Sequence, residues 1–432
     1  MRTKLPTTLT GTRAGTTLAL FGVVLFVASL LVGAALAPSV GGADDGETRR
    51  TLVGSQGGGP GLHEAGSVYL LDGREIQWRA GETDSYFDVT MLDNGSVMTG
   101  FMNSGYEDCG PYESPCTHTG FRIIEPNADS GAAPEIVYEY SFPVRTRANS
   151  EVHDVERLGS GGFLVTDMEY ERIFIVENGT ITWQWNASSR YDAPADPTRT
   201  DWLHINDVDV ISEDRYLVSI RNAHQLVIVE RGEGVVEVIN ADDDPTDDES
   251  PDPKGDPTVL RQQHNPQWLG NGTVLVADSH NDRIVELRRN ETGVWNVAWA
   301  VDSAEGVPFS WPRDADRLPN GNTLITDSLN KRVVEVNATG ATAWSYATPH
   351  VPYEAERLPA GETVGGVAYA DGGEATVGEH QDIPVLSFLL LLLQTGLQTP
   401  FWFTEAHVAV TLVSLGCVLG GGGIVLHGRL RG

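Results

Sequence analysis

A short pattern of polar and hydrophobic positions recurs along the middle of the chain. Most copies have an acidic residue, a hydrophobic residue, two variable positions and Leu or Ile, followed by a turn containing Gly or Asn and a β-branched run. The copies begin at Asp88, Asp154, Asp207, Pro266, Asp314 and, more faintly, Glu354. Short runs of this kind, bounded by turn residues, predict β-strands.

Each copy continues into further predicted strands. Thr323–Asp327 and Arg332–Val336 illustrate a second and a third strand, and a fourth strand often carries Trp, as in Trp295–Trp299. Four short strands in a repeat of 40 to 66 residues are typical of β-propeller blades. The six copies therefore predict an all-β fold, a six-bladed β-propeller.

The first and last segments of the repeat region complement each other. The last copy lacks its outer strands, whereas Ser67–Leu71 and Glu75–Trp78 precede the first copy and have no inner strand of their own. Pairing them completes one blade and removes open sheet edges. We therefore expect the ring to be closed by strands from its two ends.

The N-terminal region contains a long apolar run. Leu18–Ala37 is uncharged, follows Arg2, Lys4 and Arg13, and is long enough to cross a bilayer as a helix. Because it exceeds the usual apolar core of a signal peptide, an uncleaved anchor is favoured over a cleaved signal.

Two further apolar runs lie near the C-terminus. Ile383–Leu393 and Val408–Leu426 are separated by a segment whose aromatic residues are typical of a membrane interface. If both runs crossed the membrane, the terminal Arg429 and Arg431 would lie outside, against the preference for positive residues inside. An interfacial first run is therefore favoured.

The chain is expected to have seven parts. These are a cytoplasmic N-terminus (1–14), a transmembrane anchor or signal peptide (15–37), a linker (38–62), the propeller (63–372), a linker (373–382), a hydrophobic interfacial or transmembrane segment (383–403) and a transmembrane helix (406–427). We expect the terminal helices to contact membrane lipid, and the propeller to lie on the extracytoplasmic side of the cell membrane.

The chain carries a large excess of negative charge. It has 60 Asp and Glu against 29 Lys and Arg, which gives a formal net charge of −31. Nucleic acid is excluded as a partner because its phosphates would be repelled. An excess of carboxylates suits concentrated salt and indicates a halophilic habitat. The acidic stretch 241–257 is expected to be a solvated insertion, with a calcium site as the alternative.

Sequons and cysteines also indicate an exported domain. Cys109 and Cys116 are close in the chain and are expected to form a disulfide outside the cytoplasm. Candidate glycosylation sites occur at Asn94, Asn178, Asn186, Asn271, Asn290 and Asn337. Because Asn-Gly is also turn chemistry, only some of them are expected to be modified.

Equivalent positions of the first strands predict a pocket on the propeller axis, where those strands line the channel. Five residues before the Leu or Ile of each copy stand Phe87, His153, Asn206, His264, Arg313 and Tyr353, and two residues earlier stand Ser85, Glu151, His204, Gln262, Trp311 and Val351. Period-two alternation points both sets the same way. Any one histidine is as well explained by a buried hydrogen bond, but their clustering predicts a functional site.

One further cation lies next to this cluster. Arg221 is expected on the second strand of the His204 blade, flanked by apolar strand residues, where a guanidinium needs a partner such as an anionic ligand. With Asp201-Trp-Leu-His204-Ile-Asn206 before it and Gln263-His264-Asn265 after it, this part of the sequence resembles the bacterial aryl sulfotransferases, which take sulfuryl groups from phenyl sulfates rather than from a nucleotide donor. The resemblance covers roughly residues 88–358.

The resemblance implies transfer of a sulfuryl group from a phenolic sulfate ester to another phenol or hydroxyl acceptor, through a sulfo-histidine and without a cofactor or metal. It implies that His264 is the nucleophile, surrounded by His153, His204, Asn206 and Arg221 as catalytic residues. Sulfuryl transfer, like phosphoryl transfer, needs in-line positioning and charge compensation, which these residue types supply. We expect His153 to assist the leaving phenolate.

Substrate binding and two alternatives complete the expectations. Arg313, Phe87, Trp311 and Tyr353 are candidate substrate-binding residues, through charge or ring stacking. The chain before the first blade is too short for the extra β-domain of the better-known sulfotransferases, and the Cys109/Cys116 loop precedes the His153 blade, so substrate range stays open. A non-catalytic propeller that binds a ligand or glycan is one alternative. A metal-dependent hydrolase or lactonase using Glu151, Asn206 and Asp154 is another.

Overall fold

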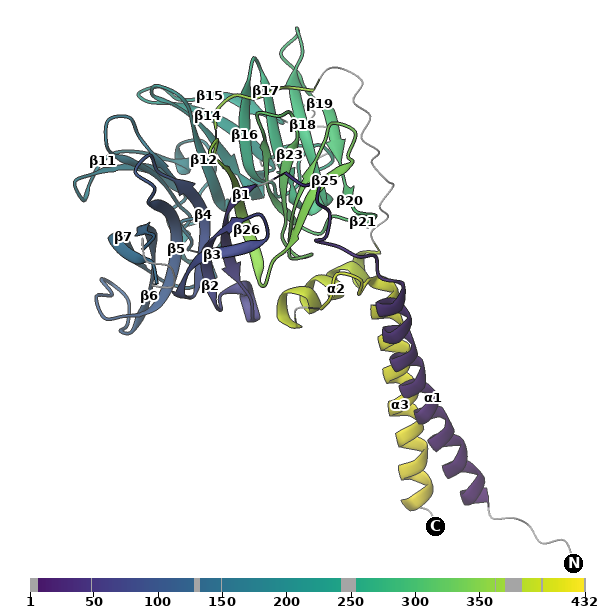
Figure 1. Ribbon diagram of the computed structural model, residues 1–432. Coiled ribbons are helices and arrows are strands. Elements are labelled where there is room, and N and C mark those ends of the chain that lie inside the picture. Colours follow the sequence, from purple (N-terminus) through teal and green to yellow (C-terminus); the bar gives the residue numbers. More distant parts are fainter. Residues whose placement is uncertain are drawn as a thin grey trace, which may run out of the picture. The chain divides into compact units, whose positions relative to one another are not determined.

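A propeller and a pair of long helices make up the chain. The computed structural model describes residues 7–47, 49–127, 133–148, 150–241, 254–361, 363–369, 383–397 and 399–430. Residues 39–378 form one compact unit, and residues 1–38 with 379–432 form another. The larger unit contains six four-stranded antiparallel sheets arranged as blades (Figure 1), which confirms the predicted six-bladed propeller.

Five blades are continuous in sequence. Blade 1 consists of β4 (Ser85–Met91), β5 (Val97–Tyr106), β6 (Cys116–Glu125) and β7 (Glu135–Val144). Blade 2 consists of β8 (Val155–Arg157), β9 (Phe163–Asp167), β10 (Arg172–Glu177) and β11 (Thr180–Asn186). Blade 3 consists of β12 (Ile205–Ser212), β13 (Arg215–Ile220), β14 (Gln225–Glu230) and β15 (Gly234–Ile239). Blade 4 consists of β16 (His264–Gly270), β17 (Thr273–Asp278), β18 (Arg283–Arg289) and β19 (Trp295–Val301). Blade 5 consists of β22 (Pro312–Arg317), β23 (Thr323–Asp327), β24 (Arg332–Val336) and β25 (Thr342–Ala347), and a hairpin of β20 (Ser303–Ala304) and β21 (Val307–Pro308) precedes it.

The sixth blade joins the two ends of the propeller. Its strand order is β26 (Val351–Leu358), β1 (Arg50–Gly57), β2 (Gly66–Asp72) and β3 (Glu75–Thr83). The stretch 38–62, expected to be a linker, therefore contains a strand. Leu52 and Val53 are fully buried in β1, and a Cβ on Gly54 would collide with the backbone oxygen of Phe87. Close packing of its backbone against the neighbouring blade, rather than a strong apolar alternation in its sequence, therefore stabilises β1.

Three blades share a buried ion pair between neighbouring strands. The last residue of the second strand is Asp and the first residue of the third strand is Arg in Asp167–Arg172, Asp278–Arg283 and Asp327–Arg332, each with an Nε–Oδ2 distance of 2.7 Å. Burial raises the pKa of Asp278 to about 6, against the opposing effect of Arg283. Each pair ties the strand-connecting turn to the sheet.

The smaller unit is built from three helices: α1 (Thr7–Leu36), α2 (Pro384–Leu397) and α3 (Glu405–Leu430). The segments Thr12–Leu36 and Glu405–Leu430 are long and apolar enough to cross a membrane, judged by length and composition. The 14 residues of α2 span only about 21 Å as a helix, less than the roughly 30 Å of a bilayer core.

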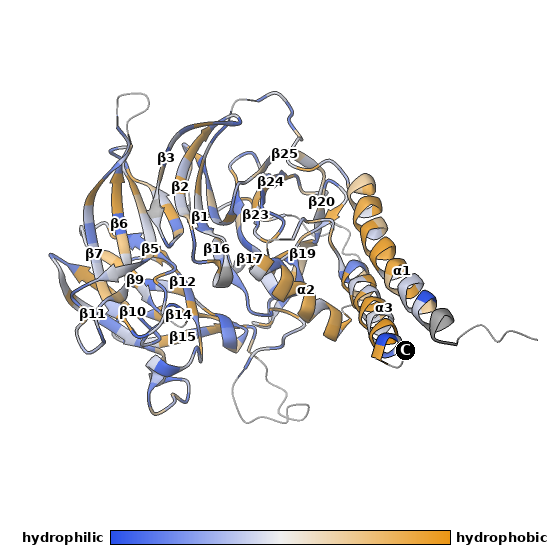
Figure 2. Ribbon diagram, turned by 90° about the horizontal axis from the view of Figure 1, so that it is seen from below, coloured by the Kyte–Doolittle hydropathy of each residue, from blue (hydrophilic) through white to orange (hydrophobic). Residues whose placement is uncertain are grey.

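Small residues bring α1 and α3 into close antiparallel contact. A Cβ on Gly15 would lie 2.6 Å from the backbone oxygen of Gly421, and one on Gly22 would lie 2.6 Å from that of Ser414. Gly15 and Gly22 are seven residues apart on α1, and Ser414 and Gly421 are seven residues apart on α3. Seven residues is the repeat of two helices packed along a seam. Hydrophobic residues make up much of both helices (Figure 2), and some of them, such as Val24, are exposed.

The loop cysteines are buried, whereas most sequons lie at the surface of the propeller. Cys109 and Cys116 are joined by a disulfide. The sequons at Asn94, Asn178, Asn271 and Asn290 are exposed, and those at Asn186 and Asn337 are half-buried. Within the acidic stretch 241–257, residues 242–253 lie outside the described residues, as do residues 373–382.

Candidate active site

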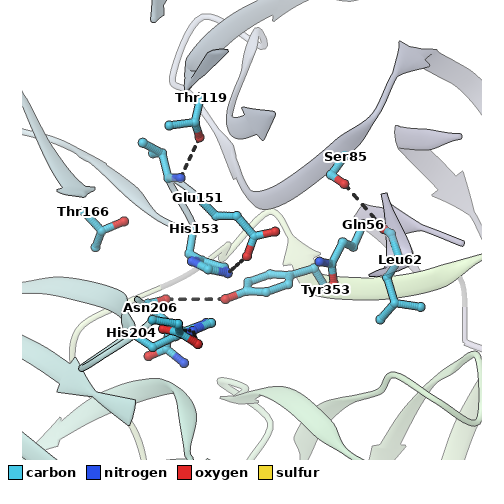
Figure 3. A network of polar contacts seen from close by, with 12 residues as sticks. Gln56, Leu62, Ser85, Thr119, Glu151, His153, Thr166, His204, Asn206 and Tyr353 are labelled. Atoms are coloured by element: carbon cyan, nitrogen blue, oxygen red, sulfur yellow. Dashed lines mark hydrogen bonds and ion pairs between the residues drawn. The ribbon is translucent and has the colours of Figure 1, made fainter. Parts of the chain in front are cut away.

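Side chains at or near the first strands of all six blades meet in one cluster. Figure 3 shows part of it, with His153, His204, Asn206 and Tyr353 close together. The His153 ring lies 5.0 Å from Phe87 and 5.0 Å from His204, and the His204 ring lies 6.5 Å from His264. Tyr353 of the closing blade connects to the rest, with its ring 5.4 Å from His153 and 6.2 Å from His264. The two register positions identified in the sequence therefore converge.

A recurrent backbone feature directs these side chains. His204, Gln262 and Trp311, at equivalent positions of three consecutive blades, have φ values of 56°, 49° and 52°. This left-handed conformation is costly for residues other than glycine and is found at functional sites. The strain is sustained by partners from the preceding blade: the three backbone N–H groups donate to Glu171 at 2.6 Å, to the His224 ring at 3.2 Å and to Asp282 at 2.7 Å.

Glu171 is the most extensive of these partners. Its carboxylate accepts the backbone N–H groups of Leu203, His204 and Ile205 at 2.6 to 3.0 Å. Burial raises the pKa of Glu171 to about 8, although the three backbone donors act in the opposite direction. The carboxylate therefore fixes the turn that presents His204 to the centre of the cluster.

His264 has one nitrogen available for chemistry. Its Nδ1 lies 2.8 Å from the hydroxyl of Ser279, and that hydroxyl donates its proton to the backbone oxygen of Ala277 at 3.2 Å. Ser279 must then accept a hydrogen bond from Nδ1–H, which leaves Nε2 unprotonated. Burial, with the nearby Arg221 and Arg313, holds the pKa of His264 well below its usual value. The ring is thus neutral and carries a free lone pair.

The two ring nitrogens of His153 also have different environments. Nε2 lies 2.8 Å from the Glu151 carboxylate, whereas Nδ1 is buried and has no hydrogen-bond partner among the described residues. A carboxylate accepts only from an N–H, so the proton of neutral His153 lies on Nε2. Nδ1 is left to exchange a proton with a ligand.

His204 and Asn206 lie on the neighbouring blade. The Nδ1 atom of His204 lies 2.8 Å from both carboxylate oxygens of Asp201, and burial, with Arg221 close by, lowers its pKa to about 4. The side-chain nitrogen of Asn206 donates to the backbone oxygen of Gln263 at 2.9 Å. Nδ1 of His204 and the amide of Asn206 are therefore held in fixed orientations.

Two guanidinium groups give the cluster a positive character. Arg221 begins the short helix η4 (Arg221–Ala223), is largely buried, and has its closest carboxylate, Asp201, at 3.8 Å. Arg313 is buried against the Trp311 ring at 3.9 Å and donates to Gln56. Burial lowers the pKa of Arg313 to about 10, so it stays charged at neutral pH. Neither has a carboxylate partner at hydrogen-bonding distance among the described residues, so both are suited to an anionic ligand.

The candidate aromatic residues are not equivalent. Phe87 is fully buried against Met102 and Tyr353 and forms the support beneath His153. The Trp311 ring stands edge-on to His264 at 6.1 Å, and its indole N–H is buried with no partner among the described residues. Trp311 therefore offers both a ring edge and an unused donor to a ligand beside His264, whereas Phe87 acts through packing.

The residues proposed for a metal-dependent hydrolase are not assembled as expected. Asp154 accepts the backbone N–H of Val208 at 2.6 Å, which turns it toward the neighbouring blade. Ligand atoms of Glu151, His153 and His204 do lie within 4.8 Å of one another. The buried charge of Arg313 and Arg221 opposes a second cation at this position, so the donor set fits a metal poorly.

Three site residues were missed from the sequence, whereas strand alternation already placed Glu151 on the same face as His153. His63, Gln56 and Ser279 belong to no repeat position. Gln56 lies in the segment expected to be a linker, His63 is the first residue of the expected propeller, and Ser279 follows the second strand of its blade. His63 and Gln56 reach the site only because the ring is closed, and Ser279 reaches it through the turn after β17.

Comparisons with known proteins agree with this site. A family model described as Arylsulfotransferase (ASST) matches residues 150–295, which include His153, His204, Asn206, Arg221 and His264. This confirms the resemblance to an aryl sulfotransferase-type family for that part of the chain. No curated protein matches the chain at a significant level.

Solved structures share the fold at low identity. A protein of unknown function from Bacteroides caccae aligns with a TM-score of 0.50 and 14% identity, over 72% of this chain and 100% of that chain. A periplasmic gluconolactonase from Pseudomonas aeruginosa aligns with a TM-score of 0.42 and 11% identity, over 72% of this chain and 99% of that chain. The first similarity shows the propeller fold alone, and the second carries no argument about function.

Proposed function

We propose, from the premise that residues 150–295 match an aryl sulfotransferase-type family, that this propeller moves a sulfuryl group from a phenolic sulfate ester to a second hydroxyl compound. The observation that carries the proposal is the state of His264: a neutral, buried imidazole whose Nδ1 is fixed by Ser279, which leaves an Nε2 lone pair free, and which has two guanidinium groups, Arg221 and Arg313, nearby. Such a nitrogen is a nucleophile without needing a metal or nucleotide.

The first half of the reaction follows from this arrangement. The Nε2 lone pair attacks sulfur, the bond from sulfur to the aryl oxygen breaks, and the aryl oxygen leaves with its electron pair. A proton from Nδ1 of protonated His153 neutralises the phenolate. Arg221, His204 and Asn206 compensate charge on the sulfuryl oxygens during transfer.

The second half reverses these roles. The acceptor hydroxyl gives its proton to Nδ1 of His153 and attacks sulfur, and the bond from sulfur to Nε2 of His264 breaks, which returns the electron pair to the imidazole. Arg313 adds positive charge at the donor side, and Trp311 and Tyr353 lie beside the path of the aromatic ring. The cycle is a two-step transfer with a sulfo-histidine intermediate.

The test uses the full chain in detergent and concentrated salt. Release of nitrophenolate from 4-nitrophenyl sulfate is followed with and without phenol, for the wild type and for His264→Ala. We expect release that depends on phenol and is lost in the variant. His350→Ala is the matched control, because His350 lies outside the cluster, is half-buried and begins no strand of the site.

The outcomes separate the alternatives. Mass spectrometry after exposure to donor alone should find one sulfuryl group on the peptide containing His264. Release that needs no acceptor and is abolished by a chelator would instead support a metal-dependent hydrolase. Absence of release from several aryl sulfates would refute the transferase and leave a binding propeller.

We also place the propeller on the extracytoplasmic side of the cell membrane. The antiparallel contact of α1 and α3 puts Arg13 and Arg429 at the same end of the helix pair, and positive residues favour the cytoplasmic side. The C-terminal end of α1 at Leu36 and the N-terminal end of α3 at Glu405 then lie at the opposite end of the pair. The disulfide between Cys109 and Cys116 and the four exposed sequons support the same location.

A further inference from the structure

A row of buried polar groups runs from the closing blade to His153. The Nδ1 atom of His63 lies 3.0 Å from the Ser85 hydroxyl, and its Nε2 lies 3.4 Å from Oε1 of Glu151. The other oxygen of Glu151, Oε2, lies 2.8 Å from Nε2 of His153. Figure 3 shows the Glu151 carboxylate pointing at the His153 ring from the side opposite Asn206.

The charge on Glu151 is maintained by its neighbours. Burial alone would raise the pKa of Glu151, but attraction and hydrogen bonding from His153, with His63 and His204 nearby, lower it to about 2. A buried carboxylate with one imidazole bonded to Oε2 at 2.8 Å and a second imidazole 3.4 Å from Oε1 stays ionised at neutral pH. It therefore favours a positive charge on the imidazole to which it is most tightly bonded.

His63 contributes from a segment far away in sequence. It directly follows the short helix η1 (Pro60–Leu62) between β1 and β2, and its backbone oxygen accepts a hydrogen bond from Arg147. Burial lowers the pKa of His63, so the ring is neutral. The Ser85 hydroxyl lies 3.0 Å from Nδ1 and also lies 3.5 Å from the backbone oxygen of Leu62. A carboxylate accepts only from an N–H, so the geometry favours the tautomer with the proton on Nε2, which lies 3.4 Å from Glu151. His63 thus lies beside the oxygen of Glu151 that His153 does not use.

We propose that Glu151 and His63 are positioning residues that make His153 the proton donor to the leaving phenolate, an inference that rests on the proposed transfer reaction. Glu151 binds Nε2–H of His153 and stabilises the imidazolium, and His63 fixes the Glu151 carboxylate. Only Nδ1–H of the imidazolium then faces the substrate.

The step balances with these groups alone. As the bond from sulfur to the aryl oxygen breaks, the Nδ1–H bond of His153 breaks and its proton joins the aryl oxygen, leaving a neutral phenol and neutral His153. The proton on Nε2 stays in the hydrogen bond to Glu151. The acceptor hydroxyl later returns a proton to Nδ1, so neither Glu151 nor His63 changes its protonation state over the cycle.

A series of substituted phenyl sulfates tests the inference. A poor leaving group such as unsubstituted phenol needs a proton during bond cleavage, whereas nitrophenolate leaves without one. General acid catalysis contributes about 10²- to 10⁴-fold. We expect Glu151→Gln to lower kcat/KM for phenyl sulfate by about 100-fold or more and that for 4-nitrophenyl sulfate by only a few-fold. His63→Phe should show the same trend at about tenfold.

Two comparisons exclude a merely structural effect. His153→Gln should reproduce the leaving-group dependence of Glu151→Gln, and combining both changes should add no further loss, because Glu151 acts through His153. His350→Ala should leave the dependence unchanged. If Glu151→Gln does not fold, His63→Phe, which keeps the Glu151–His153 pair, must still show the trend.

The result that would overturn the inference is an equal loss of kcat/KM for all donors in Glu151→Gln and His63→Phe. This outcome differs from failure of the proposed function, in which the wild type itself releases phenol from no aryl sulfate.

Discussion

Three ion pairs of the same geometry allow the effect of burial to be measured inside one protein. In Asp327–Arg332 both side chains are fully buried, whereas the side chain of Arg172 in Asp167–Arg172 is 19% exposed. The Arg332 guanidinium also donates to the backbone oxygens of Ala304 and Val307, at 3.0 and 3.1 Å. Arg332→Met therefore leaves one carboxylate and two carbonyl groups without their donor in the core.

The expected magnitudes differ clearly. Breaking a fully buried pair costs about 3–5 kcal/mol, and solvent access to one partner reduces that cost. The unfolding entropy of a domain spanning residues 39–378 is roughly 0.7 kcal/mol per degree. We expect Arg332→Met to lower Tm by about 4–7 °C. Arg172→Met should lower Tm by less, because water can reach the site that the partly exposed guanidinium leaves, although Asp167 itself is buried.

The measurement is differential scanning calorimetry of the full chain in detergent at constant salt. The double variant Asp327→Leu/Arg332→Met is the control, because removing both partners leaves no unpaired charge and should recover most of the lost Tm. Equal Tm losses for Arg332→Met and Arg172→Met would show that burial does not set the strength of these pairs.

Two further predictions concern the site and the helices. Burial and Arg221 hold the pKa of His204 in the folded state at about 4, below its value in the unfolded chain. The neutral ring therefore contributes to the free energy of unfolding in full above pH 6.5, and this contribution is lost as the pH falls toward 4. Lowering pH from 7 to 5 should cost about 2 kcal/mol, seen as a drop in Tm that is smaller in His204→Asn; an equal drop in both would contradict the assignment. In the helix pair, a Cβ on Gly22 would lie 2.6 Å from the backbone oxygen of Ser414, so Gly22→Leu should force α1 away from α3 and lower the Tm of the helix pair in detergent. Val24→Leu, at an exposed position, should leave that Tm unchanged, and an equal Tm in both variants would refute the close packing of α1 on α3.

Most of the fold could be predicted from the repeat, because the alternating apolar residues of each strand are buried within their own blade or against the next one. The Leu or Ile at the end of each first strand and the Gly or Asn turn after it define the register, and this register predicts that His153, His204, Asn206 and His264 share one face. Such positions are predictable because the spacing between them is set within a single strand.

Other features depend on contacts between distant segments. The strand β1 contains Gly54, Ser55 and Gly57, which weaken its apolar pattern, and it forms because β26 and β2 lie on either side of it. For the same reason His63 could not be assigned to the site. The N–H contacts of Glu171 with His204 and of Asp282 with Trp311 join turns of one blade to strands of the next, and no local pattern records them.

The closure of the ring has a consequence for how the protein is made. Arg50 pairs with Leu358, so the contact that completes the propeller must await synthesis of nearly the whole domain. Contacts of such long sequence separation form slowly, because closing the intervening loop has an entropic cost that grows with its length. Tyr353, on the strand that arrives last, joins His153 to His264, while Gln56 and His63 come from the segment synthesised first. An incomplete chain therefore cannot assemble this cluster, and catalytic activity would report directly on the last step of folding.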